Sequence, residues 1–338
     1  MAVKALPLHS GASSAASACV PRRTLVRAAC ASVLCTPWAI SAQGSFPNKP
    51  VRIIVPLPPG GAADQSVRIL GDYMRPHLGH SMVVDNKPGG LYMIGLQGAM
   101  AAPADGYTLI HLNATMCAVQ ASTGRFDLLR QFAPLGLMGM SDVVLAVSSQ
   151  APFRTLPELI AWNKANPGKL SYGSLGPGSM DHLMMVSILG KDAPAASNIP
   201  FKGGPEAAMA LARGEIDAMT MAVSLLVQSQ GRFRAIGILS DQRSASLPDL
   251  PTAREQGVDV PVVQYWGGLA APAGTPKAAR DFLEGALGAA LRTPGLQERL
   301  APLGMVARFA GAEAFRKLIE WDLKWLGEAV RDAKLKPG

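Results

Sequence analysis

The 338-residue chain contains few charged residues, few aromatic residues and few cysteines. Charged residues account for 17% and aromatic residues for 6%, whereas hydrophobic residues account for 49%. A hydrophobic content of this size excludes a disordered or charge-driven chain. No uninterrupted apolar run approaches the roughly 20 residues of a membrane-spanning helix, so the mature protein is not expected to span a membrane. The length predicts about two domains.

The chain also lacks concentrated positive charge outside its first 42 residues. Its formal net charge is +8, and half of this charge comes from Lys4, Arg22, Arg23 and Arg27, in a stretch without Asp or Glu. The remaining charge is scattered, with no basic run and no stripe of basic and aromatic residues. Binding of nucleic acid is therefore not expected.

Residues 1–42 have the layout of an export leader. A basic stretch is followed by a weakly apolar segment, residues 28–40, and by the small residues Ser41 and Ala42. Cleavage near Ala42 would begin the mature chain at about Gln43. Arg22 and Arg23 resemble a twin-arginine signal, but ordinary secretory leaders also contain paired arginines, so both export routes stay open.

Three of the four cysteines lie in this leader: Cys19, Cys30 and Cys35. The mature chain would keep Cys117 alone and could form no internal disulfide. A lone thiol beside a predicted strand is either a nucleophile or core filler. We favour core filler, because free cysteine behaves as a small buried hydrophobic residue.

Beyond the leader, short apolar runs alternate with helical patterns, which is typical of an α/β protein with a mostly parallel sheet. A first helix is expected from Asp64 onward, with Val67, Leu70 and Met74 on one face. A last helix is expected between Ala312 and Ala333, where Ile319, Leu323, Leu326 and Val330 share a face. Strands are expected at residues 51–57, 108–112, 143–147, 170–172, 218–223 and 234–239.

Three glycine-rich turns, residues 58–64, 173–182 and 199–206, each follow a predicted strand and precede a predicted helix. Unpaired N–H groups and the positive dipole end at a helix start favour an anion. The alternative reading is structural, with Asp64 and Ser179 as helix caps and Lys202 as a solvated surface lysine. Both readings stay open on these residues alone.

Signatures of catalysis and of cofactor binding are missing. Neither Ser174 nor Ser179 has a glycine both two residues before and two residues after it, as a nucleophile elbow requires. The glycine turns match neither a Walker loop nor a dinucleotide fingerprint. His182 reads as a hydrogen-bonded wall residue, and the spacing of His77, His80 and His111 is unlike that of a zinc site. We expect no metal, no cofactor and no enzymatic activity.

Seven motifs in register resemble the receptor family of the tripartite tricarboxylate transporters, also called Bug proteins. The similarity extends over nearly the whole mature chain, from Phe46 to Pro337. The motifs are Val55-Pro56-Leu57-Pro58-Pro59-Gly60-Gly61 with Asp64, Asp85-Asn86-Lys87-Pro88-Gly89, Asp105-Gly106-Tyr107-Thr108-Leu109, Gly178-Ser179 with His182-Leu183, Pro200-Phe201-Lys202-Gly203, Leu247-Pro248-Asp249-Leu250-Pro251-Thr252, and Ala271-Pro272-Ala273-Gly274-Thr275-Pro276.

The resemblance implies an α/β fold of the periplasmic-binding-protein type II class. Two lobes, each a mostly parallel sheet flanked by helices, would be joined by two crossovers near Ser148 and Tyr265. Residues 43–148 and 266–338 would form the first lobe, and residues 149–265 the second. Closure of the lobes over a ligand would follow the hinge motion of binding proteins.

The resemblance also implies a monomeric periplasmic receptor that captures a small carboxylic acid and does no chemistry on it. Its partners would be membrane transporter subunits or a sensor protein. An exported hydrolase- or decarboxylase-like enzyme acting on a small acid is the alternative. The ligand-binding residues implied by position are Pro59, Gly60, Gly61, Asp64, Asn113 and Thr115 from the first lobe, and Gly178, Ser179, His182, Lys202, Gly203 and Asp217 from the second.

The chain departs from the family pattern at two places. Leu91 and Tyr92 put bulk where the family usually has glycines, which predicts a smaller or more apolar pocket. Asp181 and Glu206 put carboxylates in the first turns of two helices, where they stabilise the helix dipole by about 0.3–1 kcal/mol each. They could also favour a monocarboxylate, or an acid with an amino or ring-nitrogen group, over a dicarboxylate.

Overall fold

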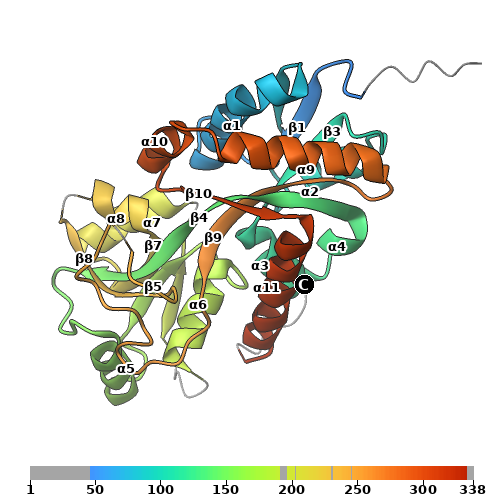
Figure 1. Cartoon of the computed structure of the whole chain (residues 1–338). Coiled ribbons are helices and arrows are strands. Elements are labelled where there is room, and N and C mark those ends of the chain that lie inside the picture. The colour runs from blue at the N-terminus through green and yellow to red at the C-terminus, as the bar shows by residue number, and fades with distance from the viewer. Residues whose placement is uncertain (1–45, 191–195, 202, 230, 245, 333–338) are drawn as a thin grey trace, which may run out of the picture. The chain divides into compact units, whose positions relative to one another are not determined.

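The computed structural model describes residues 46–190, 196–201, 203–229, 231–244 and 246–332 (Figure 1). Within these ranges the strands are β1 Val51–Val55, β2 Met82–Asn86, β3 Thr108–Asn113, β4 Phe132–Ser148, β5 Ser171–Ser174, β6 Ser197–Pro200, β7 Ala218–Ala222, β8 Phe233–Ile238, β9 Gln264–Pro272 and β10 Val306–Gly311.

The helices alternate with these strands along most of the chain. They are α1 Ala62–Leu78, α2 Met93–Met100, α3 Ala114–Thr123, α4 Leu128–Gln131, α5 Leu156–Ala165, α6 Met180–Leu189, α7 Gly204–Arg213, α8 Val223–Gln228, α9 Lys277–Leu291, α10 Leu296–Leu300 and α11 Ala312–Asp332, with a 3₁₀ turn at Ala301–Leu303. Among the described helices none combines the length and apolar character needed to span a membrane.

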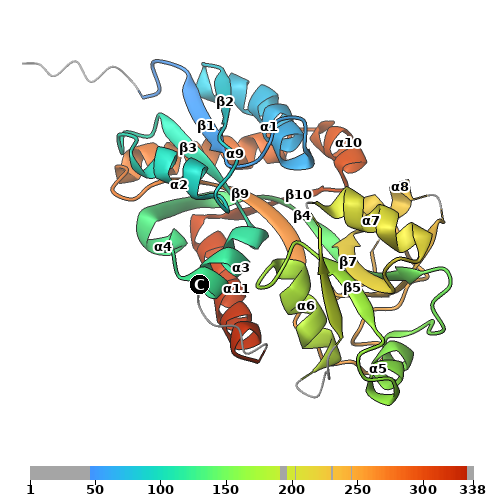
Figure 2. The same ribbon diagram turned by 180° about the vertical axis from the view of Figure 1, so that it is seen from behind.

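The sheet is mixed, with one parallel group at each end and antiparallel strands between them. Its order is β2-β1-β3-β9-β4-β7-β5-β6, and both β8 and β10 pair with β4. The β2-β1-β3 and β7-β5-β6 groups are parallel, whereas β9 and β4 pair antiparallel with their neighbours. Two parallel α/β groups are thus linked by long shared strands (Figures 1 and 2).

Strand β4 is the main link between the two groups. It pairs with β9 as far as Asp142 and with β7 and β8 from Val143 onward. The sequence predicts only residues 143–147 of it, because Pro134, Gly136 and Gly139 look like strand breakers. A Cβ on Gly139 would lie 2.8 Å from the Val306 carbonyl oxygen, so a glycine lets β10 approach. The change of partners precedes the lobe boundary expected near Ser148, and the division into lobes stays a prediction.

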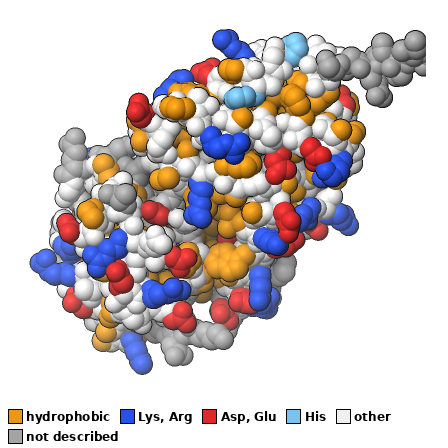
Figure 3. All heavy atoms as spheres, viewed as in Figure 1, with side chains coloured by type: hydrophobic (Ala, Val, Ile, Leu, Met, Phe, Trp, Pro, Cys, Tyr) orange, Lys and Arg blue, Asp and Glu red, His pale blue; other side chains and the backbone are white. Residues whose placement is uncertain are grey.

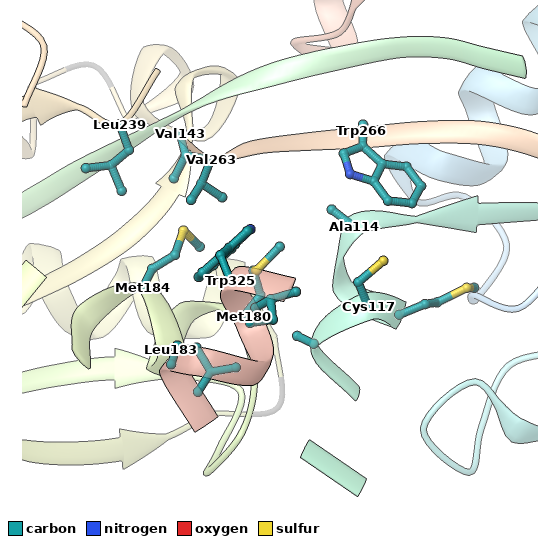
Figure 4. Close-up of a cluster of buried hydrophobic side chains, with 14 of the residues drawn as sticks. Ala114, Cys117, Val143, Met180, Leu183, Met184, Leu239, Val263, Trp266 and Trp325 are labelled. Carbon is teal, nitrogen blue, oxygen red and sulfur yellow. The ribbon is translucent and has the colours of Figure 1, made fainter. Parts of the chain in front are cut away.

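Among the described residues, three hydrophobic clusters fill the space between sheet and helices. One packs α1 and α9 on β1 and β3, and a smaller one packs α7 on β4 and β7. The largest joins α3, α6 and α11 to strands of both groups. Figure 4 shows part of it, where Met180 and Leu183 of α6 lie near Trp325 of α11. Cys117 is also fully buried in this cluster, which agrees with its prediction as core filler.

The sequence periodicity correctly identifies the first and last helices. Val67, Leu70 and Met74 are fully buried in α1. In α11, the predicted face is also buried, although Leu323 is only partly so. The sequence did not predict that Asp322 is buried on the same helix, at 3% exposure.

Candidate functional site

The candidate site lies where the carboxyl ends of parallel strands lead into helices. In the first group, β1 is followed by the turn before α1, and β3 leads directly into α3. In the second group, β5, β6 and β7 lead into α6, α7 and α8. The carboxyl ends of parallel strands form the common ligand-binding edge of α/β sheets, and the helix starts there present N–H groups.

The turn before α1 is held from within by Asp64. This carboxylate is 3% exposed and accepts hydrogen bonds from the Gly60 N–H at 2.9 Å and from Asn86 Nδ2 at 3.0 Å. Arg68 Nε donates to it at 3.0 Å. Burial alone would raise the pKa of Asp64, but the hydrogen bonds from Arg68, Gly60 and Asn86 outweigh it and lower the pKa.

The Asp64 carboxylate and the Gly60 amide are therefore hydrogen-bonded to each other, whereas the turn itself is exposed to solvent. Pro59, Gly60 and Gly61 are exposed. Gly60 has a φ of 82°, a left-handed conformation that favours glycine. The first N–H groups of α1, like those of any helix, have no intrahelical partner. Gly61, the N-cap of α1, has no side chain that could accept a hydrogen bond from them.

The turn before α6 has a similar internal lock. The Gly178 N–H donates to His182 Nδ1 at 2.9 Å, and Ser179 caps the helix by accepting from the His182 N–H at 3.3 Å. The imidazole stacks on Tyr172, and burial lowers the pKa of His182. These contacts confirm Ser179 as the N-cap and show that His182 is hydrogen-bonded; its place in a ligand-binding wall stays a prediction.

The starts of α2 and α3 come together through Tyr92 and Thr115. Asn113 caps α3 by accepting from the Met116 N–H at 3.2 Å. The Thr115 side chain acts on the hydroxyl of Tyr92, which precedes α2 and has a φ of 71°, and lowers its pKa. Burial raises the pKa of Tyr92 to about 12. The bulky departure at Tyr92 thus lies at the start of α2, close to the start of α3.

Asp181 joins the two strand groups in the first turn of α6. Its Oδ1 accepts hydrogen bonds from the Tyr265 hydroxyl at 2.6 Å and from the Thr220 hydroxyl at 3.2 Å. Burial raises its pKa, and its charge also acts on the Tyr92 hydroxyl. We call this set the Asp181 cluster; it consists of Tyr92, Thr115, Asp181, Thr220 and Tyr265.

Sequence patterns indicate neither Thr220 nor the contact role of Tyr265. Tyr265 lies in β9, far from Asp181 in sequence, and only the folded sheet brings its hydroxyl to α6. Thr220 is an ordinary residue of a buried strand, at 1% exposure. No local pattern marks either residue as part of a site.

Asp217 is not brought to this edge, which corrects its assignment to the site. It precedes β7 and accepts hydrogen bonds from the Ser171 N–H at 2.8 Å and the Ser171 hydroxyl at 2.7 Å. Because β5 and β7 are parallel, this pair lies at their amino ends, opposite the turn that carries Gly178. Gly203 is the N-cap of α7 at the carboxyl end of β6. Lys202 lies outside the described residues.

His111 and Cys117, whose side chains could suggest metal binding or nucleophilic catalysis, are buried in the core. His111 is 2% exposed, burial lowers its pKa to about 4, and neither ring nitrogen has a partner among the described residues. Burial raises the pKa of the Cys117 thiol. Within the described ranges, no group of three or more His, Cys, Asp or Glu residues is placed to hold a metal ion.

A separate cavity of about 580 Å³ lies between α11 and the strands β4, β9 and β10. Trp266, Arg308 and Trp321 are among the residues that line it. Figure 3 shows the face seen in Figure 1, where hydrophobic side chains gather in a hollow bordered by charged side chains. None of the residues of the Asp181 cluster lines this cavity.

Known proteins resemble this chain over most of its length. A UPF0065 protein of Bordetella pertussis is 31% identical and the alignment covers 87% of this chain and 92% of the relative. The protein BugT of the same organism is 30% identical, with 86% and 92% covered.

Solved structures agree with the sequence relatives. The periplasmic binding protein BugD superposes with a TM-score of 0.72 at 29% identity, covering 86% of this chain and 99% of that one. MatC from Rhodopseudomonas palustris with bound malate superposes with a TM-score of 0.71 at 26% identity, covering 84% and 100%. These likenesses confirm the predicted periplasmic-binding-protein fold class.

The family model of the tripartite tricarboxylate transporter family receptor matches residues 66–335. That match covers most of the chain, and the fold is that of solute-binding receptors. The chain therefore belongs to the tripartite tricarboxylate transporter receptor family, whose members are periplasmic solute-binding receptors.

Proposed function

We propose that this protein is exported to the periplasm and binds a small carboxylic acid between the two carboxyl edges. The turns at residues 58–61 and 113–115 would contact the ligand from one side, and those at 178–179 and 202–203 from the other. The protein would deliver the acid to membrane transporter subunits or to a sensor protein. It would leave the acid chemically unchanged.

The observation that carries this proposal is the meeting of helix starts from both groups at the Asp181 cluster. Tyr92 and Thr115 belong to the first edge, and Asp181 to the second. Helix N-termini carry partial positive charge and unpaired N–H groups, which suit a carboxylate. MatC, a family relative at 26% identity, was solved with malate, a small carboxylic acid.

The first test is a thermal-shift screen of the mature protein against small carboxylic acids. A ligand present at 100 times its Kd adds about 2.7 kcal/mol to the free energy of unfolding. Calorimetric titration of the acids that shift the melting temperature then gives their affinities. If no small carboxylic acid binds, the proposed function is wrong.

The second test removes one amide donor without disturbing the helix. Ala62 is the first residue of α1, follows an extended Gly61 and is exposed, so Ala62→Pro fits the start of the helix. We expect a roughly tenfold loss of affinity from one missing hydrogen bond. Lys277→Pro at the start of α9 is the matched control, and it should leave affinity unchanged.

The enzymatic alternative has its own readout. The acid recovered from a saturated sample after prolonged incubation should be unaltered by mass spectrometry and NMR. Release of carbon dioxide, or hydrolysis of an ester of the acid faster than the buffer rate, would establish the hydrolase- or decarboxylase-like alternative instead.

A further inference from the structure

Asp181 differs from the other carboxylate of the site in what surrounds it. Asp64 is paired with Arg68 at 3.0 Å. The hydrogen-bond partners of Asp181 are neutral: they are the hydroxyls of Tyr265 and Thr220. Among the described residues, no Lys, Arg or His side chain contributes to the shift of its pKa. A carboxylate out of bulk water without a positive partner is costly, and a ligand cation would relieve that cost.

Asp181 lies where a positively charged group of a ligand can reach it. Thr220 behind it is buried, whereas Asp181, Tyr92, Thr115 and Tyr265 are each partly exposed. The hydrogen bonds from Tyr265 and Thr220 both end on Oδ1, so Oδ2 receives neither hydroxyl. Residues of β7 and β9 thus fix the carboxylate at the start of α6. Both of their hydroxyls bind Oδ1 and leave Oδ2 to a ligand.

We propose that the Asp181 cluster binds a protonated nitrogen of the ligand, so that the protein selects an acid carrying an ammonium group over a dicarboxylate of similar length. This inference rests on the proposed function, because the ligand carboxylate is held by the helix starts. Asp181 is then the residue that determines specificity, and Tyr265 is a positioning residue that orients its carboxylate.

The two tyrosines strengthen the preference for a cation. The hydroxyl oxygen and ring face of a tyrosine are electron-rich, and an ammonium group beside them gains further attraction. The same carboxylate and hydroxyl oxygens disfavour a second ligand carboxylate, because like charges repel more strongly where less bulk water separates them. A neutral or cationic group at this end of the ligand avoids that repulsion.

Two probes of comparable length separate the alternatives: 4-aminobutanoate, with one ammonium group, and succinate, with a second carboxylate in its place. Calorimetric titration at pH 7 should show that the wild-type protein binds 4-aminobutanoate more tightly, by roughly 10- to 100-fold. In Asp181→Asn the carboxamide keeps the shape and removes the charge. We expect this variant to lose the preference, with weaker binding of 4-aminobutanoate and unchanged or tighter binding of succinate.

Matched variants keep the result interpretable. Glu158→Gln removes the first-turn carboxylate of α5, a helix outside the candidate site, and should leave the preference of the wild type. Tyr265→Phe should weaken binding of 4-aminobutanoate less than Asp181→Asn does. Circular dichroism and melting temperature verify that each variant is folded. If Asp181→Asn does not fold, Asp181→Glu, which retains the charge on a longer side chain, should keep the preference for 4-aminobutanoate.

The outcomes distinguish this inference from the proposed function. The role of Asp181 is overturned if the wild type prefers succinate. It is also overturned if Asp181→Asn keeps the wild-type ratio of the two affinities. In both cases the protein would still be a receptor for a carboxylic acid. If neither these probes nor any other small acid binds, the proposed function itself fails. Binding of 4-aminobutanoate with loss of preference in Asp181→Asn alone supports the inference.

Discussion

Asp322 is a carboxylate buried between two indole rings, and this environment raises its affinity for protons. Its Oδ1 accepts from Trp325 Nε1 at 3.0 Å, and its Oδ2 accepts from Trp266 Nε1. Burial raises the pKa of Asp322 from 3.8 to about 6, although both indole hydrogen bonds oppose the shift. Protonation is therefore easier in the folded than in the unfolded chain.

A pH dependence follows from this raised pKa. The contribution of Asp322 to stability is fully present below pH 3.8 and is lost as the pH rises through about 6. The stability of the wild type relative to Asp322→Asn should fall between pH 4 and pH 7, by on the order of 1–3 kcal/mol. Urea unfolding at a series of pH values measures this difference. A flat difference would show that Asp322 does not titrate in this range.

Asp64 should show the opposite sign because its pKa is lowered. Its contribution to stability is present above pH 3.8 and is lost as the pH falls below that value. Asp64→Asn should cost about 1.5–3 kcal/mol at pH 7, since it loses hydrogen bonds to a charged group. Asp72→Asn, on the exposed side of the same helix, should cost less than about 1 kcal/mol. Chemical denaturation of both variants at pH 7 and pH 3 tests the prediction.

At the scale of elements, the strand glycine Gly268 and the helix glycine Gly285 have opposite packing environments. Gly268 in β9 has no space for a Cβ, which would clash with the Phe315 ring and lie 2.7 Å from the Gly136 carbonyl oxygen. Gly285 in α9 has no heavy atom within 4 Å of a built Cβ. The first glycine is required by packing, and the second is not.

Substitution of these two glycines by alanine should therefore change stability in opposite directions. Gly268→Ala should lower the free energy of unfolding by about 1–3 kcal/mol through overpacking. Gly285→Ala should raise it by about 0.5–1 kcal/mol, because alanine loses less backbone entropy in a helix. Thermal unfolding of the two variants beside the wild type gives the comparison, and equal effects would contradict the packing seen at β9.

Elements with a strong local pattern could be predicted from the sequence. The start of α6 at Ser179 and the buried faces of α1 and α11 follow from caps and periodicity. The full extent of β4 and the strand β9 could not be predicted, because their glycines and prolines are acceptable only beside particular partners. Of the candidate site, the glycine turns could be predicted as helix starts, whereas the hydroxyl partners of Asp181 could not.

At the scale of the whole molecule, the shared strand β4 should make the two strand groups unfold together. The strand is hydrogen-bonded to β9 and β10 in its first part and to β7 and β8 in its second. The largest hydrophobic cluster also contains residues of both groups, including Ile110 and Tyr172. Loss of either group would expose part of this common core.

Hydrogen exchange at increasing denaturant concentration tests this cooperativity. Peptides from β1 and β3 and peptides from β5 and β7 should converge on one global free energy of unfolding before the transition. A bound acid should raise that common value. Separate opening free energies for the two groups would show that β4 does not couple them.

Local chemistry in the sequence by itself determined the α/β class, the glycine turns and the helix starts, because each depends on neighbouring residues. Tertiary structure alone decided that Asp217 lies at the wrong edge, that the Gly60 and Gly178 amides bind side chains of their own turns, and that Tyr265 reaches Asp181. Those contacts depend on strand order and register, which bring together residues distant in the chain.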